Sequence, residues 1–256
     1  MKNSKMFVIT AGMFVAGALT SVAGADFGTL SYGSTPISFV WGSGIPDNTG
    51  FVYTNSAVSG KTLAIGLRTS AYFDIANGAP TNDGVNTYTV NAGTTLWAPP
   101  AGSTDPQYAS YSASAPRWQF NWSVSMDGQR TAAALAGLNW AMRITGPGGT
   151  WGYTAAPGAD LGTAGNAAAY SQDSWQMGYN YLQVDSANTP NVGFPGLWTG
   201  LAFNPNQIGT YSVQIAVHQS GTLVGSTTMF VNVVPAPGAL ALLGVAGLAG
   251  GRRRRA

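Results

Sequence analysis

Residues 118–126 alternate strictly between apolar and polar side chains, and no other stretch constrains the fold of this chain as strongly. Five apolar residues occupy every second position of the stretch: Trp118, Phe120, Trp122, Val124 and Met126. A period of two places them all on one face of an extended strand, whereas a helix would spread them around its circumference. The stretch therefore predicts a β-strand whose apolar face packs on a core.

The same alternation recurs along the chain. It is clear in residues 138–144, 211–217 and 228–234, and weaker in residues 37–41, 50–54, 61–71, 86–90 and 176–184. Turn-forming residues such as Asp127-Gly128 separate these segments, and Ser220-Gly221 stands where residues 209–218 and 222–233 would form a terminal hairpin. Only residues 130–138, with three consecutive alanines, favour a short helix.

Many short strands joined by such turns predict an all-β fold, namely an antiparallel β-sandwich with Ig-like or jelly-roll topology. Residues 98–116 and 146–169 read as long surface loops. A domain boundary in the second loop would give two small β-domains. We favour a single domain over residues 26–233, because the aromatic residues of 118–140 need covering partners and the C-terminal strands would supply them.

The charges are few and unevenly placed. Charged residues make up 8% of the chain, every acidic residue is Asp, and Cys is absent. Six of the eleven basic residues lie in the two ends, so the five that remain face nine acidic residues and the middle of the chain has a net charge of −4. The overall charge of +2 is therefore no indication of nucleic-acid binding, and we expect no nucleic-acid partner.

Residues 1–25 have the three parts of a secretory signal peptide. Lys2 and Lys5 precede an apolar stretch at residues 6–19, and small residues follow it. Cleavage after Ala25 fits the small-x-small rule, and cleavage after Ala23 is the alternative. An uncleaved anchor would need about 20 apolar residues to span a bilayer. We therefore expect an exported protein whose signal helix is removed by signal peptidase.

The C-terminal segment, residues 234–256, has three features in order. A Pro-x-Pro motif comes first, residues 239–251 contain no polar side chain, and an arginine cluster follows. The apolar stretch would enter the membrane as a short helix, and the arginines would stay on the cytoplasmic side as a stop-transfer element. The motif is Val234, Pro235, Ala236, Pro237 and Gly238, and the cluster is Arg252, Arg253, Arg254 and Arg255.

This ordered ending resembles the PEP-CTERM sorting signal, with Ala236 at the position where that family has an acidic residue. The resemblance implies an exosortase, a membrane-embedded cysteine protease, as the processing partner, and a transient attachment to the inner membrane. It also implies a destination at the cell surface or outside the cell, in bacteria that often make extracellular polysaccharide. A simple C-terminal anchor is the alternative interpretation.

The body is similar to exported domains that accompany such tails and have no assigned activity. The likeness rests on a basic strand near Arg68, the aromatic residues of 118–122, and the segments 173–177 and 203–211. It implies a shared β-fold and supplies no reaction.

Three tryptophans are candidates for ligand binding, because an exposed ring can stack on the face of a sugar. Trp97 and Trp151 border the two long loops, and Trp175 lies between Asp173 and Asp185. Roles in the core or in pinning loops are the competing interpretation of all three.

Residues for catalysis or metal binding are sparse. His218 is the only histidine of the chain, and its strand pattern places it opposite the apolar face, near a turn. Glycoside hydrolysis needs two carboxylates, and among the aspartates Asp173 and Asp185 are the best candidates for such a pair. Asp47-Asn48 and Asn82-Asp83-Gly84 carry oxygen ligands without the regular spacing of a calcium loop. We expect no enzyme, no metal and no cofactor.

The sequence thus favours an exported structural protein of the cell surface or extracellular matrix. A carbohydrate-binding module of a surface polysaccharide layer is the first alternative, and an Asp-dependent glycoside hydrolase is the second.

Overall fold

The computed structural model describes residues 30–33, 49–72, 79–104, 114–155, 171–178 and 201–236. Eleven strands and no helix occur in these residues. The predicted signal helix, the predicted C-terminal apolar helix and the weak strand signal at residues 37–41 lie outside the described ranges.

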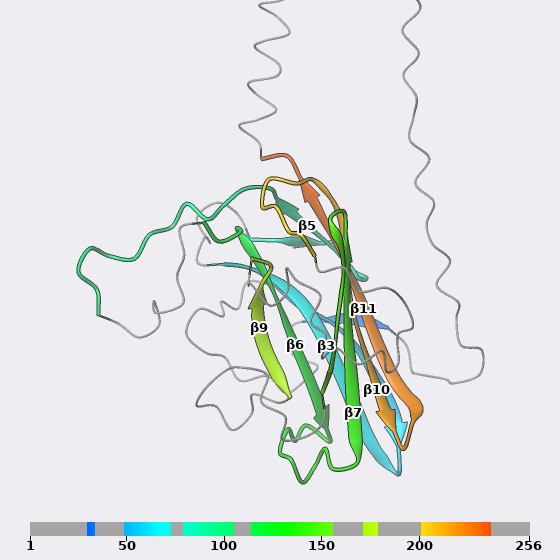
Figure 1. The fold of residues 1–256 in the computed structure, drawn as a ribbon. Coiled ribbons are helices and arrows are strands. Elements are labelled where there is room, and N and C mark those ends of the chain that lie inside the picture. Colours follow the sequence, from blue (N-terminus) through cyan, green and yellow to red (C-terminus); the bar gives the residue numbers. More distant parts are fainter. Residues whose placement is uncertain are drawn as a thin grey trace, which may run out of the picture.

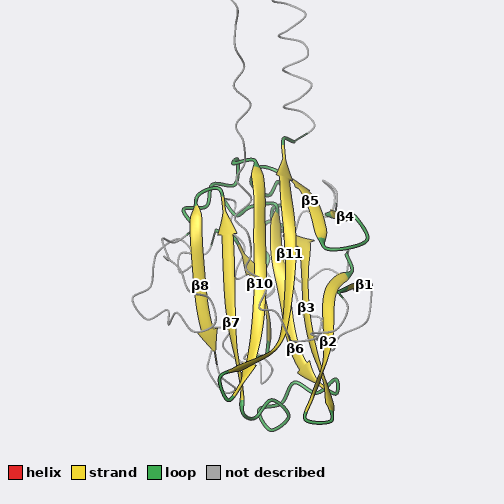
Figure 2. Cartoon of the chain, turned by 90° about the vertical axis from the view of Figure 1, so that its right-hand side faces the viewer, coloured by secondary structure: helices red, strands yellow, loops and turns green. Residues whose placement is uncertain are grey.

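The strands form two sheets that face each other, as Figures 1 and 2 show. The first sheet has the order β1 (Ser31–Gly33), β2 (Phe51–Val58), β3 (Lys61–Ala71), β6 (Trp118–Met126) and β9 (Gln172–Gln176). The second has the order β4 (Thr81–Asn82), β5 (Thr87–Asn91), β11 (Thr222–Val234), β10 (Gly209–Gln219), β7 (Leu138–Gly146) and β8 (Gly149–Ala155). The all-β class and the sandwich-like arrangement of sheets predicted from the alternation are confirmed.

Tight turns build the hairpins at one end of the body. Ser220 and Gly221 connect β10 to β11 with φ angles of 50° and 80°, as the turn residues of that segment predict. Ser59 and Gly60 connect β2 to β3 in the same way, with φ angles of 51° and 77°. Two consecutive positive φ angles define the type I′ turn, whose twist matches that of the strands it joins.

One strand pair contradicts the prediction of a purely antiparallel sandwich. β5 lies parallel to β11, with Phe230 opposite Thr87 and Val234 opposite Asn91. Five further strands separate β5 from β11 in the sequence, so no hairpin fixes their relative direction. The second sheet is therefore mixed.

The predicted loop at residues 146–169 contains a strand that the sequence reading missed. β8 pairs with β7 through residues 149–155. The glycines that suggested a loop serve close packing instead: a Cβ on Gly146 would lie 2.3 Å from the ring of Tyr211, and one on Gly148 would lie 2.3 Å from the carbonyl oxygen of Leu201.

Two further local predictions differ from the structure at the described residues. Residues 131–137 form successive turns without a helix, and the segment ends at Gly137 with a φ of 79°. Where a strand was expected at residues 176–184, a strand ends at Gln176 after spanning 172–176, residues 177–178 form a turn, and residues 179–184 lie outside the described ranges. Residues 131–137 are rich in alanine, which fits several conformations, and the contacts of the segment decide among them.

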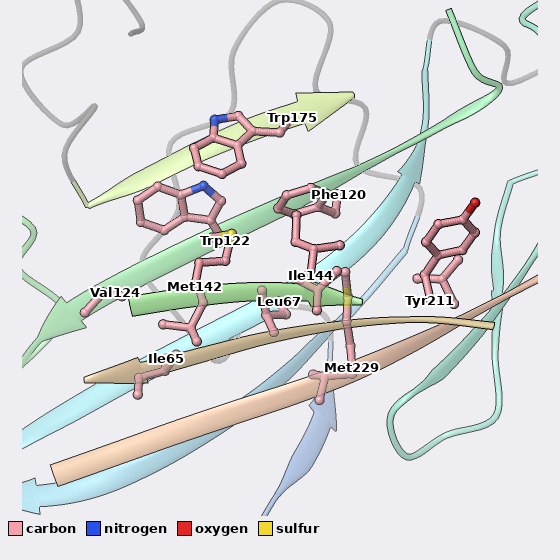
Figure 3. Close-up of a cluster of buried hydrophobic side chains, with 14 of the residues drawn as sticks. Ile65, Leu67, Phe120, Trp122, Val124, Met142, Ile144, Trp175, Tyr211 and Met229 are labelled. Carbon is pink, nitrogen blue, oxygen red and sulfur yellow. The ribbon is translucent and has the colours of Figure 1, made fainter. Parts of the chain in front are cut away.

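The core lies between the two sheets and is rich in aromatic rings. Trp118 contacts Tyr211 of β10 edge to face, with ring centroids 5.5 Å apart. Figure 3 shows Ile65 and Leu67 of β3 in the same cluster as Met142 and Met229 of the second sheet. β6 and the C-terminal strands therefore share one hydrophobic core.

Candidate functional site

The predicted sorting motif begins at the last residue of the folded body. Val234 ends β11 and is also the first residue of the motif. Its position is fixed by neighbours: it lies opposite Asn91 in the parallel pair, and its carbonyl oxygen accepts a hydrogen bond from the Ala92 N–H at 2.8 Å. Figure 2 shows the tip of β11 at one end of the body.

The sheet stops immediately after this residue. Pro235 has no N–H to donate to a neighbouring strand, and Pro235 and Ala236 are half-buried residues outside any strand. Pro237, Gly238 and the arginines at 252–255 lie outside the described residues. In the part of the chain that the structure describes, no helix is long and apolar enough to cross a membrane.

Two loops surround this end of the body, which we call the tail end: residues 92–104 and residues 201–208. They are joined by a hydrogen bond from the Gly93 N–H to the Pro205 carbonyl oxygen, 2.7 Å long. Arg117 also belongs here, because its Nε donates to the Thr94 carbonyl oxygen at 3.1 Å. In Figure 1 both loops lie at the same end of the body as the tip of β11.

The three candidate tryptophans lie in different surroundings. Trp97 is half-buried in the first loop of the tail end, where its backbone N–H donates to Thr95 Oγ1 at 3.3 Å. Trp151 and Trp175 are each 3% exposed. A sugar cannot stack on a ring that is covered on all sides, and Trp97 is the one residue of the three that is not buried.

Trp151 and Trp175 contribute to the core rather than to a surface platform. Their ring centroids are 5.6 Å apart at nearly right angles, and Trp175 also meets Trp122 at 5.9 Å. The Trp175 indole Nε1 donates to Asp173 Oδ2 at 2.7 Å. Asp173 also accepts a hydrogen bond from the Ser174 N–H, so its carboxylate orders this strand. The second carboxylate of the hydrolase hypothesis, Asp185, lies outside the described residues.

A cluster of buried polar side chains lies on the outer face of the first sheet, the face that points away from the core. Arg68 is fully buried; its Nε donates to Asn121 Oδ1 at 2.8 Å, and a second guanidinium nitrogen donates to the Thr49 carbonyl oxygen at 3.2 Å. Asn121 Oδ1 also accepts from Ser70 Oγ at 2.9 Å. The Asn121 amide donates to Ser174 Oγ on the neighbouring strand β9. Three adjacent strands are thereby linked through one asparagine.

The sequence reading did not predict that this face would be buried. It placed the polar residues of 118–126 on the face opposite the core, yet all nine residues of β6 are buried. The signal was available in the residue types, because the polar positions of β6 are Gln, Asn, Ser and Ser, without a single charge. Lys, Glu, Arg and Asp are almost never fully buried unless they are paired, so a strand face without them can be covered at a lower cost.

His218 and Asp83, two further candidates for catalysis or metal binding, contribute to local structure. His218 is half-buried at the irregular end of β10, beside Asn139 and Leu223, and burial lowers its pKa. Asp83 Oδ1 accepts hydrogen bonds from the N–H groups of Thr87 and Val85, which hold the pKa of its carboxyl below the ordinary value.

These arrangements leave no metal centre among the described residues. No group of three or more His, Asp or Glu side chains in them is placed to hold a metal ion. Asn82 Oδ1 accepts the Gly84 N–H at 2.7 Å, so the Asn82-Asp83-Gly84 turn is closed by its own side chains. Asp47 and Asn48 lie outside the described ranges.

Comparison with known proteins adds no relative. No protein-family model, no curated protein and no solved structure matches this chain.

Proposed function

We propose that this chain is an exported structural protein of the cell surface or extracellular matrix, delivered by an N-terminal signal and sorted through its C-terminal tail. Signal peptidase would remove residues 1–25, and the tail would hold the body at the inner membrane until an exosortase-like enzyme removes it. Residues 26–233 would form the exported body.

The observation that carries the proposal is that the end of the last strand coincides with the start of the sorting motif. The last paired residue of β11 and the first residue of the Pro-x-Pro motif are the same residue, Val234. A protease that acts on an extended segment needs that segment outside the hydrogen-bonded sheet. Cleavage within or after the motif would therefore leave every described strand intact.

The length of the apolar stretch favours temporary attachment. Its thirteen residues would reach only about 20 Å as a helix, against ~30 Å for the hydrocarbon core of a bilayer. Four glycines lie among residues 244–251, and glycine weakens a helix. Such a segment suits a tail that is held briefly and then removed.

A localisation experiment tests the proposal. The full chain and a variant that ends after Ala236 are expressed in an exosortase-containing bacterium, and membrane, surface and medium are assayed separately. We expect the full chain to pass through the membrane fraction to the surface, and the truncated chain to escape to the medium. Equal distribution of the two forms would contradict sorting by the tail.

A second role, binding of a surface polysaccharide, is favoured by the position of Trp97. Trp97 is a half-buried residue on a loop, whereas Trp151 and Trp175 are buried. Binding on a glycan array that disappears in Trp97→Ala and persists in a conservative core variant, Trp151→Phe, would support this role. Equal binding by both variants would contradict it.

A further inference from the structure

At the tail end of the body, the described residues of both loops are uncharged, and aliphatic side chains are exposed there. Residues 92–104 and 201–208 contain no Asp, Glu, Lys or Arg. Leu96 is 64% exposed and Ile208 is 55% exposed, two of the four large hydrophobic residues exposed in the described part of the chain. The other two, Tyr32 and Val85, lie on the edge strand β1 and on the turn before β5.

The opposite end of the body has a different surface. There the β2–β3 and β10–β11 turns approach each other, with Ser59 Oγ 3.5 Å from the Gln219 side-chain oxygen. Lys61 and Asp127 are exposed at this end, and the Asp127 carboxylate accepts the Thr62 N–H at 2.8 Å. The two ends of the sandwich therefore differ in polarity.

The path of the chain places the tail end next to the membrane whenever the tail is inserted; this step rests on the proposed function. Four residues, 235–238, separate the end of β11 from the apolar stretch. Fully extended they span about 14 Å, and the headgroup layer takes up roughly 5–7 Å of that distance.

Because the apolar stretch is short, its insertion would bring the body still closer to the membrane. A helix of about 20 Å falls roughly 10 Å short of the hydrocarbon thickness, while the arginines at 252–255 stay at the cytoplasmic headgroups. The shortfall is met by local thinning of the bilayer or by entry of residues 235–238 into the headgroup layer. Either adjustment brings the two loops to the lipid surface.

We propose that the loops at residues 92–104 and 201–208 form a lipid-contacting surface, on which Leu96 and Ile208 enter the headgroup layer of the bilayer that holds the tail. Exposed aliphatic side chains on an uncharged loop gain free energy at that depth, because apolar area leaves water and no charge is desolvated. The contact would fix the orientation of the body while the Pro-x-Pro motif is presented for processing.

The chain offers a clean labelling experiment because it has no cysteine. Leu96→Cys, Ile208→Cys and Val85→Cys are made singly in the full chain, produced in a host without an exosortase and labelled with the polarity-sensitive fluorophore NBD. The labelled proteins are reconstituted into vesicles of phosphatidylcholine and phosphatidylglycerol. Val85 is the matched control, because it is 55% exposed, as Ile208 is, and lies on the turn before β5.

We expect NBD at positions 96 and 208 to shift to shorter emission wavelengths on reconstitution and to be quenched by lipids with a nitroxide near the headgroup, while NBD at position 85 stays unchanged. Vesicle flotation reports insertion of the tail independently. Flotation with three identical water-like spectra would overturn the lipid-contacting surface and leave the tail hypothesis standing. Absence of flotation would overturn both.

Discussion

The interior of the sandwich and its tail end differ in what their residues contact. Interior residues such as Trp122 touch side chains of both sheets, whereas Leu96, Ile208 and Pro235 lie at a surface where the sheets stop. From this difference we expect the aromatic strand, the most conspicuous feature of the sequence, to contribute most to stability, and the residues proposed to act in sorting to contribute little. Substitutions in the two regions should therefore separate folding from processing.

The largest loss of stability is expected for Trp122→Ala. Its ring contacts Trp140 and Trp175, and it is fully buried. Removing such a ring costs about 3–5 kcal/mol of the free energy of unfolding, measurable by urea denaturation. Trp97→Ala at the tail end is the control and should cost clearly less, because that ring is only half-buried.

A milder change at the same interior position sharpens the result. The Trp122 indole N–H is buried and has no hydrogen-bond partner among the residues that the structure describes. Trp122→Phe therefore loses packing volume without losing a hydrogen bond and should be less destabilising than Trp122→Ala. Equal losses in the two variants would contradict the packing role of the ring.

The next largest effect is expected in the buried polar cluster of the first sheet. Asn121→Ala removes an acceptor for the Arg68 guanidinium and for Ser70, and should cost about 1–3 kcal/mol of unfolding free energy. Asn232→Ala is the matched control: its side chain accepts a hydrogen bond from Thr210 Oγ1 at an exposed site, and the change should cost no more than ~0.5 kcal/mol. Equal costs would show that the cluster does not link the strands.

A smaller effect is expected from pH. Burial lowers the pKa of His218, so the folded state resists its protonation more than the unfolded state does. Stability should be constant above the ordinary histidine pKa of 6.5 and should fall as the pH drops below it. His218 is the only histidine of the chain, so His218→Gln should remove this dependence between pH 6.5 and the onset of carboxylate titration. Thermal unfolding at a series of pH values measures it.

The smallest effect on stability and the largest on processing are expected for Pro235→Ala combined with Pro237→Ala. Both residues follow the last strand, so the unfolding free energy should change by less than about 0.5 kcal/mol. The precursor with its tail should accumulate in the membrane fraction. If the tail of this variant is removed as it is in the unchanged chain, the Pro-x-Pro motif has no role in processing.

The sequence predicted the strands where alternation and turn residues agree. β6 and β3 lie at the predicted residues, and the hairpin at Ser220-Gly221 forms as expected. Periodicity carries no information about which strands become neighbours, so the parallel pairing of β5 with β11 could not be foreseen. The strand β8 was not predicted, because the glycines around it suggested a loop. In the structure they permit close packing instead.

The candidate sites differ in how well the sequence predicts their surroundings. The Pro-x-Pro motif is a local pattern, and its first residue coincides with the end of β11. Trp151 borders a predicted loop and Trp175 lies between Asp173 and Asp185, but the burial of both depends on contacts between distant strands that no local pattern reveals. The buried face with Arg68 and Asn121 depends on what covers the sheet, and only the lack of charge in β6 hinted at it.

Intact-mass analysis of the mature protein, recovered together with its cell fraction, tests the sorting account most directly. The account predicts a chain that begins after Ala25, or after Ala23, lacks residues 239–256 and is found at the cell surface. A mature protein that retains residues 239–256 in the membrane fraction would contradict it.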